Sequence, residues 1–107
     1  MSIEIELKKP FEYDGKKIEK VKILRKEIVV FDRIKAKIEA KSVFGTEEGD
    51  AFLICLINRL CKFGEVKIPS LELAEKLSVE DFDNIVMKIA GLDEDFLQSA
   101  VKSLENS

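Results

Sequence analysis

The first part of the chain alternates apolar and polar side chains, which is the period of a half-buried β-strand. One alternating run covers residues 3–7, and a second apolar run covers residues 18–23. Between them lies Asp14-Gly15, a strong signal for a two-residue hairpin turn. The pattern therefore predicts an N-terminal β-hairpin over residues 1–27.

The spacing of the apolar residues also predicts an irregularity in the first strand. A two-residue loop pairs Phe11 with Ile18, but continuing that register unchanged would turn Val21 to the wrong face. One extra residue in the first strand corrects this and places Leu7 opposite Val21. Because proline cannot donate a ladder hydrogen bond, we expect the extra residue at Lys9–Pro10.

After residue 25 the period becomes helical, and Phe31, Ile34 and Ile38 recur at helical spacing. Helix-capping and helix-breaking residues then delimit the elements that we expect. These are residues 29–41, 47–63 (Thr46 as cap, Gly64 as stop), 69–77, 78–90 (a Ser78-to-Asp81 capping box, Gly91 as stop) and 94–104. The predicted fold class is α+β, with an N-terminal β-hairpin followed by four to five α-helices. A single domain over residues 1–107 is expected, its hairpin over 1–27 and its helical part over 28–107.

Composition agrees with one folded domain and offers little catalytic chemistry. Of the 107 residues, 46% are hydrophobic and 36% are charged, which is typical of a globular chain with a soluble surface. Histidine is absent, which removes the usual general base and the commonest zinc ligand. No glycine-rich phosphate loop and no complete calcium loop occurs. We therefore predict no catalytic, cofactor-binding or metal-binding residue and no enzymatic activity; a small enzyme is the least supported class.

The cysteines and the apolar runs indicate a cytoplasmic protein. Cys55 and Cys61 lie in one run predicted to be helical, where their thiols cannot bridge, so buried reduced thiols are expected. Charged residues appear too early at the N-terminus for the apolar core of a signal peptide. The longest apolar run, Ala51–Ile57, is far shorter than the roughly 18–20 residues that span a bilayer. We expect no membrane partner.

Charge is unevenly distributed along the chain. Residues 1–46 hold 12 basic and 8 acidic side chains, whereas residues 47–107 hold 6 and 13. One alternative function is therefore a small nucleic-acid-binding regulator that uses the basic hairpin. Its cations are Lys8, Lys9, Lys16, Lys17, Lys20, Lys22, Arg25 and Lys26. Acids interrupt this run and only two aromatic residues accompany it, so a solvated basic face is the favoured interpretation and we expect no nucleic-acid partner.

The second predicted helix has more apolar surface than a one-sided helix needs. Its apolar side chains cover an arc of roughly 200°, against a little over about 100° for an ordinary surface helix. The helix is therefore either the central rod of the domain or a surface offered to a partner, and the central rod is the simpler interpretation. If a partner binds, the predicted contact residues are Phe52, Leu56 and Phe63 at the edge of this helix. The amphipathic last helix gives a second set, Phe96, Val101 and Leu104.

The order of these features resembles the tail assembly chaperones of long-tailed bacteriophages, specifically the small Mu-like family. The likeness covers about residues 3–90. The matching residues are Leu7-Lys8-Lys9-Pro10, Asp14-Gly15-Lys16, Leu24-Arg25-Lys26, Asp32, the apolar helix over 52–60, Pro69, and Leu77 with Asp81. The chain departs from the family at Glu27, where proline is usual, at Asp32, one residue late, and in a longer loop around Val66.

The resemblance implies a non-enzymatic role without cofactors. Such chaperones bind the long, helical tape measure protein and keep it soluble while tail tube subunits polymerise around it. Members are often made in two lengths by ribosomal frameshifting, and the longer form recruits the tail tube protein. This chain would correspond to the short form. The resemblance further implies the cytoplasm of a bacterial host as the place of action, and we expect self-association into a homo-oligomer.

Overall fold

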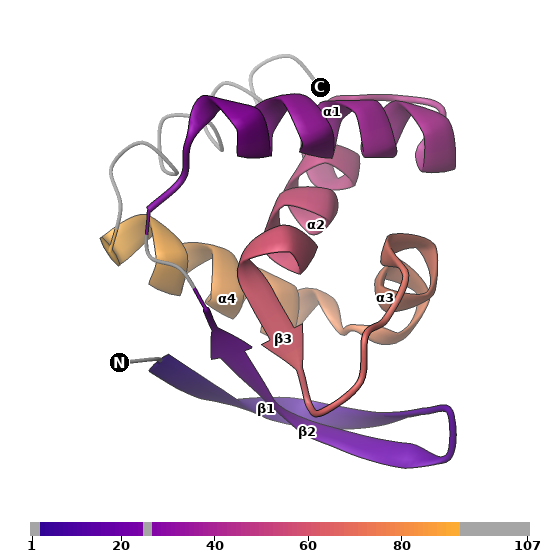
Figure 1. The fold of residues 1–107 in the computed structure, drawn as a ribbon. Helices are drawn as coiled ribbons and strands as arrows, with labels where there is room; N and C mark the ends of the chain where they lie inside the picture. Colours follow the sequence, from indigo (N-terminus) through magenta and orange to yellow (C-terminus); the bar gives the residue numbers. More distant parts are fainter. Residues whose placement is uncertain (1–2, 25–26, 93–107) are drawn as a thin grey trace.

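Seven elements follow one another along residues 3–24 and 27–92, which are the residues that the computed structural model describes (Figure 1). They are β1 (Ile3–Tyr13), β2 (Lys16–Ile23), α1 (Val30–Phe44), α2 (Gly49–Leu60), β3 (Cys61–Phe63), α3 (Ser70–Lys76) and α4 (Val79–Leu92). The strands form one antiparallel sheet in the order β1-β2-β3. The predicted α+β class, with its N-terminal hairpin followed by helices, is confirmed.

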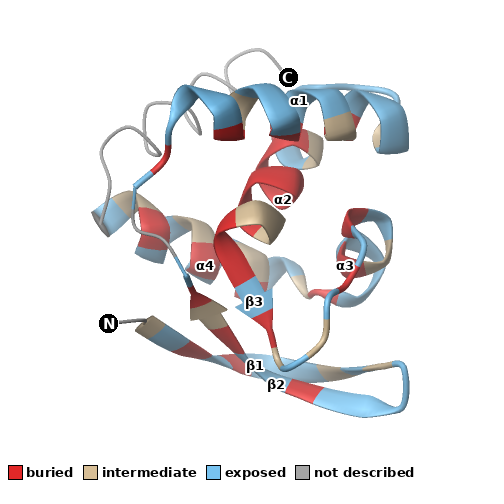
Figure 2. Cartoon of the chain, in the orientation of Figure 1, coloured by how far each residue is buried: buried red, intermediate tan, exposed pale blue. Residues whose placement is uncertain are grey.

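Helix α2 is the centre of the molecule. It runs from α1 towards the sheet, with α3 and α4 on its flanks (Figure 1). Residues 52–57 are buried without interruption, so every side of this part of α2 contacts other elements (Figure 2). The interpretation of α2 as a central rod is therefore correct.

Helix α2 is shorter than predicted, because the chain changes to a strand after Leu60. Residues Cys61–Phe63 form β3 and are buried, exposed and buried in turn, which is the period of a strand. They pair with the free edge of β2, placing Val21 opposite Phe63. The predicted helical continuation to Phe63 is wrong for this reason. The predicted cap at Thr46 is also wrong, since the N-cap residue is Glu48.

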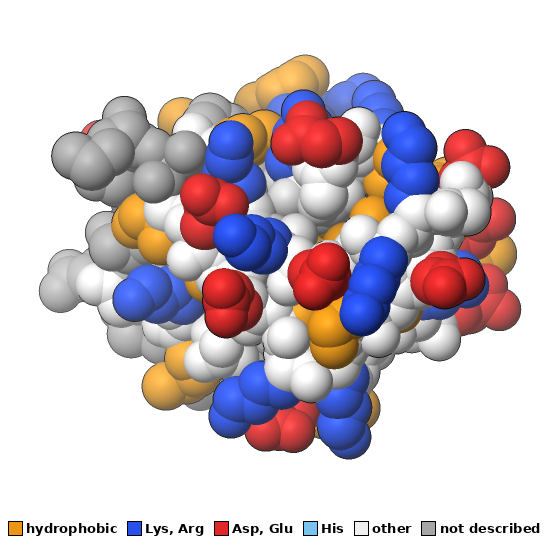
Figure 3. All heavy atoms as spheres, turned by 90° about the horizontal axis from the view of Figure 1, so that it is seen from below, with side chains coloured by type: hydrophobic (Ala, Val, Ile, Leu, Met, Phe, Trp, Pro, Cys, Tyr) orange, Lys and Arg blue, Asp and Glu red, His pale blue; other side chains and the backbone are white. Residues whose placement is uncertain are grey.

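The hairpin turns at Asp14-Gly15, as predicted. Both residues have positive φ, 53° and 75°, the combination that suits the tight two-residue turn between twisted strands. Tyr13 lies opposite Lys16 and, further along, Phe11 lies opposite Ile18. On the face turned away from the helices, lysine and acidic side chains alternate across the surface (Figure 3).

The irregularity in β1 lies where it was predicted but is larger. The register shifts between Glu6 and Phe11, because Ile5 rather than Leu7 lies opposite Val21. Residues 7–10 of β1 thus face a single residue of β2, an excess of three rather than one. Successive side chains of a strand point to opposite faces, so an excess of three residues has the same effect on the faces as an excess of one, and the apolar residues still face the core. The predicted pairing of Leu7 with Val21 is wrong.

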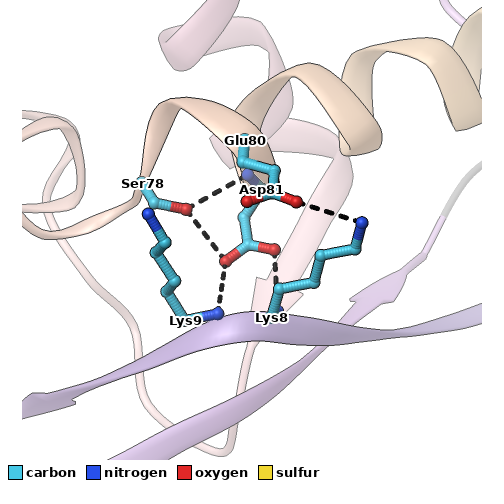
Figure 4. A network of polar contacts seen from close by, with 5 residues as sticks. All are labelled: Lys8, Lys9, Ser78, Glu80 and Asp81. Atoms are coloured by element: carbon cyan, nitrogen blue, oxygen red, sulfur yellow. Dashed lines mark hydrogen bonds and ion pairs between the residues drawn. The ribbon is translucent and has the colours of Figure 1, made fainter.

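The extra residues of the bulge bind the start of α4 (Figure 4). The main-chain N–H groups of Lys8 and Lys9 donate to the two carboxylate oxygens of Asp81, at 2.8 and 3.0 Å. Ser78 caps α4 as predicted, accepting from the Asp81 N–H at 3.1 Å and donating its hydroxyl to the carboxylate at 3.0 Å. An ion pair of 3.0 Å joins Lys8 to Glu80 beside them. The bulge therefore presents two N–H groups to one buried carboxylate.

The pKa of Asp81 reflects two opposing effects. Burial raises it, whereas the N–H groups of Lys8 and Lys9, the Ser78 hydroxyl and the charge of Lys8 lower it. The hydrogen bonds and the charge of Lys8 together outweigh the effect of burial, so the pKa of Asp81 lies below its ordinary value. The carboxylate is therefore ionised at neutral pH and holds β1 against α4.

The remaining helix ends differ modestly from the predictions. Helix α1 begins at Val30, ends at Phe44 and is closed by Gly45 in a left-handed conformation, with φ of 80°. Helix α4 continues through Gly91 to Leu92, so the predicted stop at Gly91 is wrong. Gly91 has no positive φ and takes an ordinary helical position. The last predicted helix, residues 94–104, lies outside the described residues.

Candidate protein-binding surface

The contact residues predicted on the second helix belong to the core. The side chains of Phe52, Leu56 and Phe63 are only 2%, 0% and 2% exposed. They cannot offer a surface to a partner in this fold, because α1, the sheet and the neighbouring helices already cover α2 (Figure 2). The prediction that these residues form an exposed edge is wrong. The second predicted set, Phe96, Val101 and Leu104, lies outside the described residues.

The exposed apolar surface lies instead on the outer side of α1. Four of its side chains are largely exposed, and we call them the α1 stripe: Val30 (68%), Phe31 (58%), Ile34 (49%) and Ile38 (60%). Three of them follow one another at four-residue intervals, which places them on one side of the helix. A row of this kind is uncommon on a soluble monomer and is typical of a binding surface.

The opposite side of α1 packs against the core. Its buried residues are Asp32, Ala36 and Ala40, also at four-residue intervals. The two rows are offset by two residues, which corresponds to about 200° around the helix. The small alanine side chains let α1 lie close to α2, while the larger apolar side chains point to solvent. Periodicity alone identified Phe31, Ile34 and Ile38 but could not show that they face outward.

Lysines flank the α1 stripe on both sides. Lys37 and Lys41 follow one edge of the stripe and Lys35 the other, and all three are exposed. The two acids of α1 are turned away: Asp32 is buried, and Glu39 accepts a hydrogen bond from the Ser70 hydroxyl at 3.0 Å. The exposed side of α1 therefore combines apolar side chains with positive charge only.

An ion pair beneath the stripe fixes the first turn of α1. Arg59 of α2 donates through Nε to Asp32 Oδ1 at 3.0 Å, and the Asp32 side chain is only 1% exposed. The other Asp32 oxygen accepts from the N–H of Val29 at 2.9 Å, as an acid in the first turn of a helix is well placed to do. This contact joins α1 to the central helix at the point where the stripe begins.

Two cations hold the ring of Phe31. The Arg59 guanidinium carbon lies 5.4 Å from the ring centroid and the Lys35 Nζ lies 5.8 Å from it, both within cation–π range. The most prominent aromatic side chain of the stripe is thus positioned by the residue that pairs with Asp32. Sequence reasoning missed this arrangement, since Arg59 and Phe31 come from different helices.

A cleft of about 610 Å³ adjoins the stripe at Arg59 and is lined by the end of α2, β3 and the loop that follows. Several of its polar side chains already make contacts within the fold. Asn58 donates to the Ile68 carbonyl at 2.9 Å and to the Ser70 hydroxyl at 3.0 Å, and Lys62 pairs with Glu65 at 3.3 Å. Asn58, Lys62 and Glu65 of the cleft are therefore used to hold α2, β3 and the following loop together.

The basic hairpin does not form a continuous positive surface. Glutamates lie opposite lysines across the two strands, in the pairs Glu4 with Lys22, Glu6 with Lys20 and Glu12 with Lys17. Such pairs offset one another's charge. The mixture of red and blue in Figure 3 shows the result on the outer face of the hairpin.

The two cysteines are free and buried, as predicted, although Cys61 lies in β3 and not in the helix with Cys55. Burial raises the pKa of each thiol to about 12. Over the described ranges, no group of three or more His, Cys, Asp or Glu side chains could hold a metal ion. In the same ranges, no helix has the length and apolarity needed to cross a membrane.

Comparisons of the chain with known protein families, with curated proteins and with solved structures find no match. The resemblance to tail assembly chaperones thus stays a prediction made from the order of residues in the sequence.

Proposed function

We propose that this protein is a phage or prophage tail assembly chaperone that binds the tape measure protein through the α1 stripe. The observation that carries the proposal is the row of four exposed apolar side chains on the outer side of α1. A chaperone that keeps a helical client soluble needs apolar surface of this kind on a stable, charged domain. The role is non-enzymatic and belongs in the cytoplasm of the bacterial host.

The structural roles of the residues that carry the resemblance support this proposal. Asp14-Gly15 makes the hairpin turn, and Pro10 lies in the bulge of β1. Asp32 fixes the start of α1, and Asp81 joins α4 to the bulge. Each of these residues has a role in the fold and not in a contact with a partner. Residues that specify a fold are expected to keep the same order along the chains of one family.

The proposed contact surface is therefore the α1 stripe and not the edge of α2. The tail tube protein remains a proposed partner of a longer, frameshifted form, and self-association remains part of the proposal. The set Phe96, Val101 and Leu104 remains a second proposed contact. Nucleic acid is the weaker alternative, because the pairing of glutamate with lysine across β1 and β2 offsets the charge that such binding requires.

The test is co-expression with a phage tape measure protein, which the proposal expects to be encoded just downstream of this chain. We expect the wild type to keep that client in the soluble fraction and to co-purify with it. The variant Ile38→Asp should lose both effects while unfolding at the same temperature as the wild type. The matched control is Met87→Asp, which charges an exposed apolar side chain on α4 and should keep the client soluble. Equal behaviour of the two variants would contradict the assignment of the α1 stripe.

A further inference from the structure

The α1 stripe also indicates what kind of segment binds to it. We infer that its partner is an acidic amphipathic helix, with an apolar seam flanked on both sides by glutamate or aspartate. This inference rests on the proposed function only in taking the stripe as the contact surface, and it specifies the chemistry of the segment bound there.

The dimensions of the stripe suit a helix. Residues 30–38 rise about 12 Å along α1, which is a little more than two helical turns. A partner helix with apolar residues at four- and three-residue spacing can pack against such a row with its own side chains between those of α1. Phe31, which contacts Arg59 and Lys35, supplies an aromatic contact at one end.

The flanking charges select the sign of the partner. Lys35, Lys37 and Lys41 are exposed, and none of them lies in an ion pair with another residue of the described ranges. A helix seated on the stripe brings its own flanking residues within reach of these three long side chains, although the Nζ of Lys37 lies 6.0 Å from the ring centroid of Phe52. Acidic residues there form ion pairs, whereas basic residues repel.

The same charges argue against two other occupants. A second copy that presents its own α1 would place lysine beside lysine along the whole contact. An anionic membrane would approach not only the stripe but also the exposed acids at the two ends of α1, Glu27 before it and Glu47 and Glu48 after it. A single helix that crosses α1 at an angle contacts the stripe and its lysines but keeps its ends away from these acids.

The experiment measures the binding of two labelled synthetic peptides to the full chain by fluorescence anisotropy. Both have about 18 residues and the same leucine seam, and they differ only in carrying glutamate or lysine on the flanks. We expect the acidic peptide to bind at least about tenfold more tightly and to weaken as salt is added. Replacing Lys35, Lys37 and Lys41 together by glutamate should reverse the preference. A matched charge reversal at Lys16, Lys17 and Lys20 of the hairpin should leave it unchanged.

Failure of this inference is distinguishable from failure of the proposed function. If Ile38→Asp abolishes client binding but the two peptides bind equally, the function stands and the charge selection is wrong. If Ile38→Asp affects neither the client nor the peptides, both are wrong.

Sedimentation that shows a dimer dissociated by Ile38→Asp would assign the stripe to a second copy and overturn the inference. Lysine-dependent binding to vesicles containing phosphatidylserine, without a peptide preference, would assign it to a membrane and also overturn it. Tighter peptide binding by Leu104→Asp would assign the stripe to the chain's own C-terminal residues, with the same consequence.

Discussion

The carboxylate of Asp81 accepts a hydrogen bond of 2.8 Å from the main-chain N–H of Lys8, 73 residues earlier in the chain. This contact explains why the first strand has a bulge and why the last described helix begins where it does. A carboxylate that is 1% exposed must be satisfied, and the bulge supplies the donors that a regular ladder would have used. The hairpin and α4 are therefore parts of one unit.

The first prediction concerns the removal of this charge. Replacing Asp81 by asparagine leaves one oxygen as an acceptor and sets an amide N–H₂ against a main-chain N–H. We expect the free energy of unfolding at pH 7 to fall by about 2 kcal/mol, as for other hydrogen bonds to buried charged groups. Urea unfolding followed by circular dichroism measures this. The control is Asp83→Asn, which removes an exposed carboxylate from the same helix and should change little.

The same variant predicts a pH dependence. Because the pKa of Asp81 is lower in the folded chain than in the unfolded chain, the ionised group stabilises the fold at pH values above about 4, its unfolded value. That contribution is lost as the pH falls through the folded pKa. The difference in stability between wild type and Asp81→Asn should therefore shrink on acidification. A difference that stays constant from pH 7 to pH 3 would contradict the assignment.

The second prediction concerns the ion pair beneath α1. Arg59→Met leaves the carboxylate of Asp32 buried without the guanidinium at 3.0 Å, and we expect a loss of about 2–4 kcal/mol. The double variant Arg59→Met with Asp32→Asn removes the buried charge as well and should be less destabilised than Arg59→Met alone. Thermal and urea unfolding of the three proteins give the comparison. An additive double variant would show that the two side chains are not coupled.

The third prediction separates core from surface. Phe52→Ala should lower the free energy of unfolding by about 3–5 kcal/mol, because it opens a cavity at the centre of the molecule. Ile38→Ala should change it by less than about 0.5 kcal/mol, because that side chain already contacts water. Equal losses would mean that the outer side of α1 is covered in solution.

The fourth prediction concerns the thiols. With the pKa of Cys55 and Cys61 raised to about 12 by burial, only on the order of one thiol in ten thousand is ionised at pH 8. Iodoacetamide should label the native protein very slowly and should label both cysteines after unfolding in urea. Mass spectrometry counts the adducts. Rapid labelling of either cysteine under native conditions would contradict the structure.

The local features of the fold could be predicted from the sequence because they depend on neighbouring residues. Asp14-Gly15 sets its own turn, and Ser78, three residues before Asp81, caps α4. The position of the bulge could be predicted because Pro10 has no N–H to donate and because the apolar residues of both strands must lie on the same face of the sheet. Its size could not be predicted, because it is set by a carboxylate more than 70 residues away.

Features that depend on tertiary neighbours were harder to predict. Residues 61–63 fit the apolar arc of a helix as well as the alternation of a strand, and the free edge of β2 decided between them. Periodicity showed that Phe31 and Ile38 share one side of α1 but not whether that side faces the core. The contact residues were therefore placed on α2, whose large apolar arc is explained by the uninterrupted burial of residues 52–57.

The dependence of the bulge on Asp81 has a consequence for the order of folding. A chain is synthesised from its N-terminus, so the hairpin leaves the ribosome long before the residue that completes it has been added. During that interval, water is the partner of the N–H groups of Lys8 and Lys9. The bulge of β1 can therefore reach its final hydrogen bonding only after the residues of α4 have left the ribosome.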